Sequence, residues 1–386
     1  MKKFIQLTCM ICISILFLKC KNNTEPKPEG ESSVPFDLTE EFVLYENSEF
    51  NNSNPKAIYS ETNEEIYIVF TQVPPSLNST AIMFTVLSER GEVIQSPIQI
   101  GSVKSISSFP NITLTNGSIF VTWHGNNENS TSDGFAITEL SRDGNILRQS
   151  LSGTEPAASL KGDGLLVNQT SLYHFYNAEL DEDISTIVYI RASIENNLES
   201  ESSAIIENGI IHHAYWDNNS IKIVYTQIGE LNTATFDTQS GTFNNIVKLE
   251  SIDHFDPVVS FSPLPDGENV AAIAQISANL SLQFYDIAGN KTKTVNIKPE
   301  AYNFSNIAVK DSLISIAWVS GENNIELTLY SLLSNHLYEI KQINKSITGI
   351  AIEPLLLSTP SGILTFWRDT RNHNGGDIYY RRTNGL

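Results

Sequence analysis

The stretch Gly362–Tyr380 reads GILTFW over 362–367, RDTRNHNGG over 368–376 and DIYY over 377–380. Both ends alternate apolar and polar residues and are rich in β-branched and aromatic side chains, which predicts two strands. The middle is polar and contains glycine, which predicts the turn of a hairpin. Weaker copies of this hairpin recur along the chain roughly every fifty residues.

Three markers define the repeat and keep the same spacing. The first is a proline that opens a short apolar segment, a place where a strand tolerates its missing N–H: Pro55, Pro110, Pro156, Pro257 and Pro354. The second is an aromatic residue that closes a later strand: Phe70, Trp123, Phe175, Trp216, Trp318 and Trp367. The third is a turn glycine: Gly91, Gly144, Gly241, Gly289 and Gly385. Two prolines are missing from the series, near Ser203 and Ser305, and filling these gaps predicts seven repeats.

Short alternating strands joined by Asn-, Ser- and Gly-rich turns make up each repeat, and no long helical period follows Cys20. Units of four short antiparallel strands repeated seven times predict an all-β, seven-bladed β-propeller. An array of β-sandwiches is the alternative. We expect a propeller domain over 38–386, with blades near 54–101, 109–152, 155–200, 203–249, 256–298, 304–343 and 350–386.

The two ends of the repeat array are complementary. The last repeat stops after its third strand, whereas an additional apolar strand, about 41–47, precedes the first repeat. We expect this N-terminal strand to be added to the last blade. It would close the ring and remove an open sheet edge.

The N-terminus combines a basic start, Met1-Lys2-Lys3, with an apolar segment over 4–18 and Cys20. The apolar segment is shorter than the roughly 20 residues that span a bilayer, which predicts a signal helix. The pattern resembles a bacterial lipoprotein signal, and its loose cleavage box is similar to those of spirochaetes. The resemblance implies a signal peptide over 1–19, acylation of Cys20, and anchoring in the bacterial cell envelope at the outer membrane. An ordinary signal peptide or an uncleaved anchor is the alternative.

Residues 20–37 comprise this cysteine and a Pro-, Glu- and Asn-rich segment, which predicts a disordered tether. All three cysteines, at positions 9, 12 and 20, precede the domain, which excludes disulfides and Cys-ligated metals there. The net charge of −20 argues against a nucleic-acid partner, since it repels phosphate backbones. The acyl chain is therefore the expected membrane contact, and we expect a monomer.

No metal site is predicted, because the histidines are scattered singly or adjacent in a strand. The acidic run 179–183 is the one candidate for Ca²⁺, but it lacks the spaced ligands of a calcium loop. We expect no cofactor.

In a propeller, the loops between the second and third strands of each blade, and those joining successive blades, converge on a central funnel. We call these the funnel-side loops, and we expect function there because strands hold such loops rigidly. The candidate ligand-binding residues are Arg368, Asp369, Arg371, His373 and Asp377 in the last hairpin, with His124, Asp217 and Asp256 in other loops.

The last hairpin carries the pattern Trp-x-Asp-x-Arg-Asn…Gly-x-Asp-Ile-Tyr, which resembles a motif of bacterial propellers, some of them similar to sialidases. The resemblance implies a propeller fold and, as one option, an Arg-lined patch for a glycan carboxylate or sulfate. The other option is structural, with aspartates that bind turn amides and Arg371 paired across the hairpin. The Ser-x-Asp-x-Gly-x-x-Trp boxes of sialidases are absent.

No catalytic set is recognisable in the sequence. We expect an envelope-anchored lipoprotein whose propeller is a binding or scaffold module for a protein or a glycan, without catalysis. The alternative is a divergent sialidase-like or other sugar-active enzyme.

Overall fold

The structure, a computed structural model, describes residues 36–46, 49–75, 79–103, 109–115, 117–126, 133–152, 158–181, 184–217, 219–251, 259–267, 269–276, 279–286, 288–298, 305–321, 323–345, 348–372 and 375–384. The predicted signal helix, Cys20 and the tether up to residue 35 lie outside these ranges. Within them, no helix is long and apolar enough to cross a membrane. The strands belong to the compact unit Leu38–Asn384, and β1 (Asp37–Leu38) straddles its boundary.

The described strands form seven antiparallel sheets, which follow one another in chain order. The first four sheets contain β3 (Asn51–Ser60), β4 (Glu65–Val73), β5 (Thr80–Ser88) and β6 (Val93–Val103); β7 (Asn111–Thr115), β8 (Ser118–Asn126), β9 (Asp133–Leu140) and β10 (Ile146–Ser152); β11 (Ala158–Val167), β12 (Ser171–Asp181), β13 (Ile184–Ser193) and β14 (Ser200–Glu207); and β15 (Gly209–Asp217), β16 (Ser220–Gln227), β17 (Glu230–Asp237) and β18 (Thr242–Ser251).

The last three sheets contain β19 (Val259–Pro263), β20 (Asn269–Ile276), β21 (Asn279–Asp286) and β22 (Lys291–Lys298); β23 (Ser305–Lys310), β24 (Leu313–Val319), β25 (Ile325–Ser331), β26 (His336–Leu337) and β27 (Lys341–Gln342); and β28 (Ala351–Thr359), β29 (Gly362–Asp369) and β30 (Asp377–Asn384), with β2 (Phe42–Tyr45) paired to β30.

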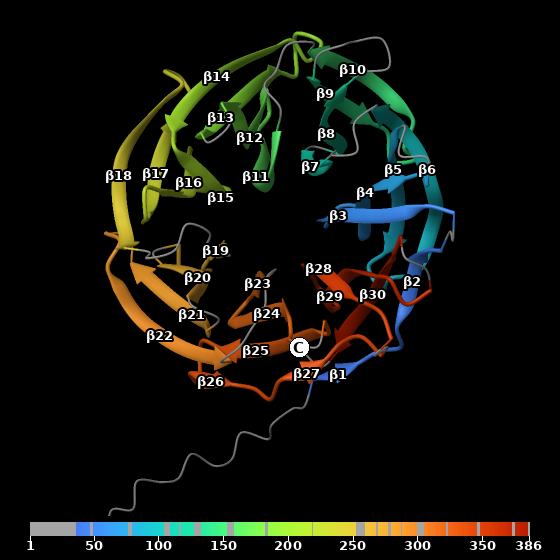
Figure 1. Cartoon of the computed structure of the whole chain (residues 1–386). Helices are drawn as coiled ribbons and strands as arrows, with labels where there is room; N and C mark the ends of the chain where they lie inside the picture. The colour runs from blue at the N-terminus through green and yellow to red at the C-terminus, as the bar shows by residue number, and fades with distance from the viewer. Residues whose placement is uncertain are drawn as a thin grey trace, which may run out of the picture. The chain divides into compact units, whose positions relative to one another are not determined.

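The first strand of each sheet contacts the first strand of the next, in the order β3, β7, β11, β15, β19, β23 and β28, and β28 returns to β3. Within Leu38–Asn384 the sheets therefore close a ring, with these first strands innermost (Figure 1). The predicted all-β propeller of four-stranded antiparallel blades is confirmed.

The N-terminal strand closes this ring. In the pairing of β2 with β30, Phe42 lies opposite Tyr380 and Val43 opposite Tyr379. Leu44 is 4% exposed and packs in a core cluster that the first and last sheets share, with Ile66, Ile68, Phe70, Met83, Leu364, Phe366, Ile378 and Tyr380. The predicted closing strand is confirmed, although it is shorter than 41–47.

The core lies between neighbouring sheets, because the second strand of a blade is buried on both faces. All nine residues of β4 are buried. The aromatic residues that mark second strands, among them Phe70, Trp318 and Trp367, are fully buried. No sheet can bury these faces alone, so the stacking of blades around the ring supplies the hydrophobic stabilisation.

The boundary between the third and fourth repeats differs from the prediction. β14 is the outer strand of the third sheet and β15 the first strand of the fourth, so the predicted blade start near Ser203 is wrong, and Trp216 lies in a first strand. Asn208 alone connects the two sheets, with φ of 55°. Beyond it, the backbone of Ile211 in β15 forms two hydrogen bonds with the side chain of Asn177 in β12. These bonds attach β15 to the preceding blade. Such a one-residue connection leaves no loop signal in the sequence.

The proline marker also has a different structural basis in two blades. Pro110 directly precedes β7, as predicted, but Pro55 and Pro354 lie inside β3 and β28. Both occupy β-bulges, between Ser53 and Lys56 in β3 and between Ile352 and Leu355 in β28. A bulge frees its extra residue from the ladder, so the missing N–H of proline is tolerated there as well.

Candidate functional site

The last hairpin places its two aspartates at facing strand ends. Asp369 ends β29, Asp377 begins β30, and the two residues are register partners. The intervening loop, 370–376, joins a second strand to a third, so it is a funnel-side loop as predicted. The Asp369 and Asp377 residues are 1% and 0% exposed, respectively. Both carboxylates therefore lie beneath the surface.

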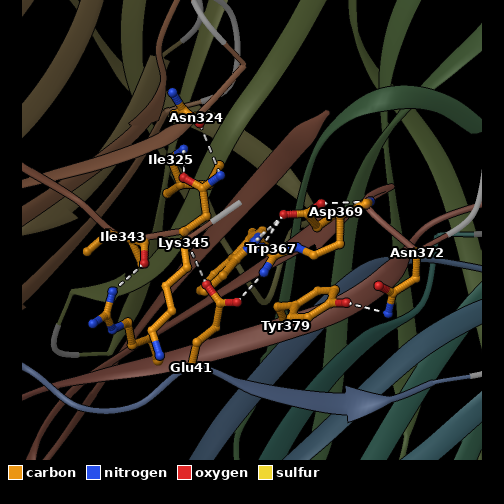
Figure 2. A network of polar contacts seen from close by, with 12 residues as sticks. Glu41, Asn324, Ile325, Ile343, Lys345, Trp367, Asp369, Asn372 and Tyr379 are labelled. Carbon is orange, nitrogen blue, oxygen red and sulfur yellow. Dashed lines mark hydrogen bonds and ion pairs between the residues drawn. The ribbon is translucent and has the colours of Figure 1, made fainter. Parts of the chain in front are cut away.

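Asp369, Arg371 and Glu41 form what we call the closure network (Figure 2). One oxygen of Asp369 accepts the backbone N–H of Arg371 at 2.9 Å, and the other lies 2.5 Å from the Arg371 guanidinium. The same guanidinium forms an ion pair with Glu41, which directly precedes the closing strand β2. The side chains of Arg371 and Glu41 are only 14% and 6% exposed. Both terminal nitrogens of the Arg371 guanidinium are thus bonded within the protein.

Aromatic packing holds the Arg371 guanidinium in place. Its central carbon lies 4.2 Å from the centre of the Tyr379 ring, in a cation–π arrangement. Burial lowers the pKa of Arg371, but its hydrogen bonds to Asp369 and Glu41 and the negative charges of these carboxylates together raise the pKa by more, so Arg371 remains charged. Burial also raises the pKa of Tyr379 to about 12, although the guanidinium opposes this shift. The Tyr379 hydroxyl accepts a hydrogen bond from Asn372 at 2.8 Å and is neutral at physiological pH.

The closure network extends to the connection between the sixth and seventh sheets. The second oxygen of Glu41 accepts the backbone N–H of Lys345 at 2.8 Å, and Arg381 donates to the Ile343 carbonyl at 2.7 Å (Figure 2). Gly349 lies so close that a Cβ there would be 2.5 Å from the Arg371 nitrogen and 2.6 Å from an Asp369 oxygen. The motif residues thus join the N-terminal segment, the last hairpin and the connecting chain.

Asp377 has a different structural partner. Its carboxylate accepts a hydrogen bond from Asn52 at 3.3 Å, and Asn52 in turn accepts one from Gln72 at 3.2 Å. The Asn52 backbone also donates to the Gly376 carbonyl at 3.1 Å. This chain of polar contacts connects the last blade to the first one, next to the closure.

Arg368, Glu353 and Asn54 form a more accessible group, the axial rim, at the funnel end of the innermost strands β3 and β28. Arg368 donates to the Gly375 carbonyl at 3.0 and 3.3 Å, and its remaining nitrogen lies 3.8 Å from Glu353. Glu353 also accepts the Asn54 backbone N–H at 3.0 Å. The side chains of Arg368 and Glu353 are 19% and 22% exposed.

The axial rim contains an unusual backbone. Asn54 and Glu353 have φ of 53° and 58°, in the left-handed region that residues with a Cβ rarely occupy. Each directly precedes a proline inside a bulge. Conformations of this kind concentrate at functional sites, where the surrounding structure holds them. Among the described members of the predicted last-hairpin group, Arg368 has the most exposed charged side chain, at 19%.

Two other predicted site residues do not lie in funnel-side loops. His124 lies in β8, not in a loop, and packs between blades against Phe135, His174 and Tyr176, with ring centres 4.3 to 5.5 Å apart. Asp217 ends β15 and pairs with Lys222 at 2.9 Å. Because β15 is a first strand, the turn after it lies at the opposite ends of the strands, and the predicted funnel-side position of Asp217 is wrong. His373 and Asp256 lie outside the described residues.

Metal ligands do not gather in the part of the chain that the structure describes, where no group of three or more His, Cys, Asp or Glu residues is placed to hold an ion. The side chains of the acidic run 179–183 are not described.

Sequence reasoning missed Glu41, Asn52 and Glu353. Glu41 had a usable signal, because the predicted pairing of β2 with the last blade brings an acidic residue to the arginine-rich hairpin. Asn52 and Glu353 had none, since their roles depend on strand bulges and on contacts between blades that are distant in sequence.

No protein-family model matches the chain, and no curated protein matches it either. Solved structures do. A polysaccharide lyase described as a PL25 ulvan lyase shares 12% identity and a TM-score of 0.58, over 89% of this chain and 95% of that one. Polysaccharide lyase Uly1 shares 8% identity and a TM-score of 0.55, over 90% of this chain and 99% of that one.

A third similar structure is a puromycin hydrolase, with 13% identity and a TM-score of 0.50 over 86% of this chain. The chain spans about half, 52%, of that enzyme's length. At such identities these likenesses show the propeller fold alone.

Proposed function

We propose that the protein is an envelope lipoprotein, anchored through an acyl chain on Cys20, whose propeller binds a glycan or a protein at its funnel side without catalysing a reaction. The observation that carries the proposal is the closure network. Of the motif residues that most resemble a catalytic set, Asp369 is buried, and Arg371, whose side chain is 14% exposed, forms ion pairs with both Asp369 and Glu41. Next to this network, the axial rim keeps two charged side chains partly exposed, Arg368 at 19% and Glu353 at 22%.

The burial of both motif aspartates argues against hydrolysis by this hairpin. A glycosidase places two carboxyl groups about 5 to 10 Å apart on either side of the bond that it cleaves. Asp369 and Asp377 are 1% and 0% exposed, so neither reaches a substrate in this structure. A binding site needs only one accessible charged group with its neighbours fixed, and Arg368 fulfils that requirement.

An acidic glycan is the first ligand to test. An arginine recognises carboxylate and sulfate groups through its N–H donors. Two nitrogens of Arg368 donate to Gly375, and the third lies 3.8 Å from Glu353, beyond hydrogen-bond distance, so its N–H groups can reach a ligand. Two proteins of similar fold are named polysaccharide lyases, which supports starting with polysaccharides.

The test is retention of the purified protein on immobilised sulfated and uronate-containing polysaccharides. We expect retention that Arg368→Ala abolishes and Arg148→Ala preserves, because Arg148 lies in the outer strand β10 and pairs with Glu139 at 2.5 Å. Equal retention of both variants would exclude the axial rim. A protein ligand is indicated if no polysaccharide is retained but a membrane protein co-purifies in an Arg368-dependent manner.

The alternative, a divergent sugar-active enzyme, predicts product release from the same polysaccharides or from a panel of glycosides. Release that disappears in Asp369→Asn would show that the closure network is catalytic and would contradict the proposal. The anchor is tested separately. Cys20→Ala should move the protein from the detergent phase to the aqueous phase, and an unchanged partition would refute acylation at that residue.

A further inference from the structure

A pocket of about 420 Å³ opens between the fifth and sixth sheets. It is lined by the β19–β20, β23–β24 and β25–β26 turns and by residues of β21, β22 and β25. These turns join first to second strands and third to fourth strands, so the pocket lies at the strand ends opposite the funnel-side loops. Its walls are mainly apolar: Leu264, Pro265, Phe284, Leu332 and Leu333. It is therefore separate from the axial rim.

Lys293 supplies a positive charge to this pocket. Its Nζ donates to Asn335 Oδ1 at 2.6 Å and to the Tyr330 hydroxyl, and it lies 5.0 and 5.8 Å from the ring centres of Tyr330 and Phe284. An ammonium group carries three donors, and these contacts use two of them. The other two lysines of β22, Lys291 and Lys298, form ion pairs with glutamates. All the described contacts of Lys293 are therefore with neutral groups.

We propose that this pocket binds a small monocarboxylate with an apolar body. A carboxylate oxygen would take the third donor of Lys293, a charge-assisted bond that is strengthened beside apolar walls. The apolar body would replace water against Leu264, Leu332 and Leu333. The volume lies within the range of about 300 to 1,000 Å³ that is usual for small-molecule sites.

The remaining polar residues of the pocket restrict the ligand's charge. Asp266 and Asp311 also line it, and both are exposed. Because these two carboxylates share the pocket with a single lysine, they repel a second negative charge on the ligand, which disfavours phosphates and dicarboxylates. The net charge of the chain, −20, acts in the same direction. A single negative charge on an apolar body is the combination that fits.

The experiment measures hexanoate binding to the full chain by ligand-observed saturation-transfer NMR, with hexanol and hexylamine as neutral and cationic controls. We expect hexanoate to bind and the controls not to. Lys293→Met should raise the Kd by about tenfold or more, the usual effect of losing a hydrogen bond to a charged group. Lys293→Arg should restore binding, which separates the ligand contact from any loss of structure.

Lys291→Met is the matched control. Lys291 lies on the same strand and is a lysine as well, but it pairs with Glu250 and does not line the pocket. Its variant should bind hexanoate as the wild type does. Equal binding of hexanol and hexanoate, no binding of hexanoate, or equal loss in Lys291→Met and Lys293→Met would each overturn the proposal.

Discussion

Replacing Arg371 by methionine tests whether the closure network is structural. The substitution keeps most of the aliphatic volume against Tyr379 but removes the counter-charge of Asp369 and Glu41, whose side chains are 1% and 6% exposed. Removing one partner of a buried ion pair costs about 3 to 5 kcal/mol, because the remaining charge stays buried and uncompensated. Arg371 itself is 14% exposed, so some water reaches the site, and we expect a loss of about 3 kcal/mol.

The assay is equilibrium unfolding in guanidinium chloride, followed by circular dichroism. The triple variant Glu41→Gln, Asp369→Asn, Arg371→Met removes all three charges and should recover most of the loss, since replacing a whole buried ion group is often close to neutral. Arg191→Met is the control: Arg191 and Glu201 form an exposed pair at 3.6 Å, so the change should cost no more than about 1 kcal/mol.

This reasoning is refuted if Arg371→Met lowers the free energy of unfolding by no more than the Arg191→Met control does. The closure network would then not stabilise the ring, and the structural role assigned to the motif, which supports the proposed function, would fail with it.

Three further predictions follow from the closure and the core. Leu44→Ala should lower the free energy of unfolding by about 2 to 4 kcal/mol, because it empties a buried position of the closing strand, and limited proteolysis should then cut the N-terminal segment faster; an unchanged cleavage rate would contradict closure by β2. Gly349→Ala should destabilise the protein in thermal melts, because the added Cβ meets the Arg371 backbone at 2.5 Å, and a melting temperature equal to that of the wild type would show that the connection moves freely. His174 is fully buried, neither ring nitrogen has a described hydrogen-bond partner, and burial, assisted by the charge of Lys56, lowers its pKa from 6.5 to about 3. The folded state therefore resists protonation, so stability is full above pH 6.5 and is lost as the pH falls towards 3. This residue accounts for about 3 kcal/mol of loss between pH 7 and pH 4, which His174→Phe should remove from the pH profile of unfolding.

Much of the architecture was predictable from local sequence pattern. Alternating apolar residues and turn glycines specify short strands through interactions within a few residues, so the repeat period and the propeller class follow from them. The closing strand was predictable as well. The N-terminal end has an additional strand and the last repeat lacks one, so pairing these two ends completes the last blade. The predicted blade boundary near Ser203 was wrong, because Asn208 alone connects the two sheets and gives no loop signal.

Local sequence pattern specifies which segments become strands, that the units must stack to bury their faces, and which hairpin gathers the charged residues. What those charges do depends on contacts that form only in the folded protein. Arg371 could pair across its hairpin, bind a ligand or join the N-terminal segment, and these options differ by contacts with Glu41, 330 positions away. Burial, not residue type, turns Asp369 into a structural anion and leaves Arg368 accessible, because the free energy of a charge depends on the solvent and partners that the fold provides.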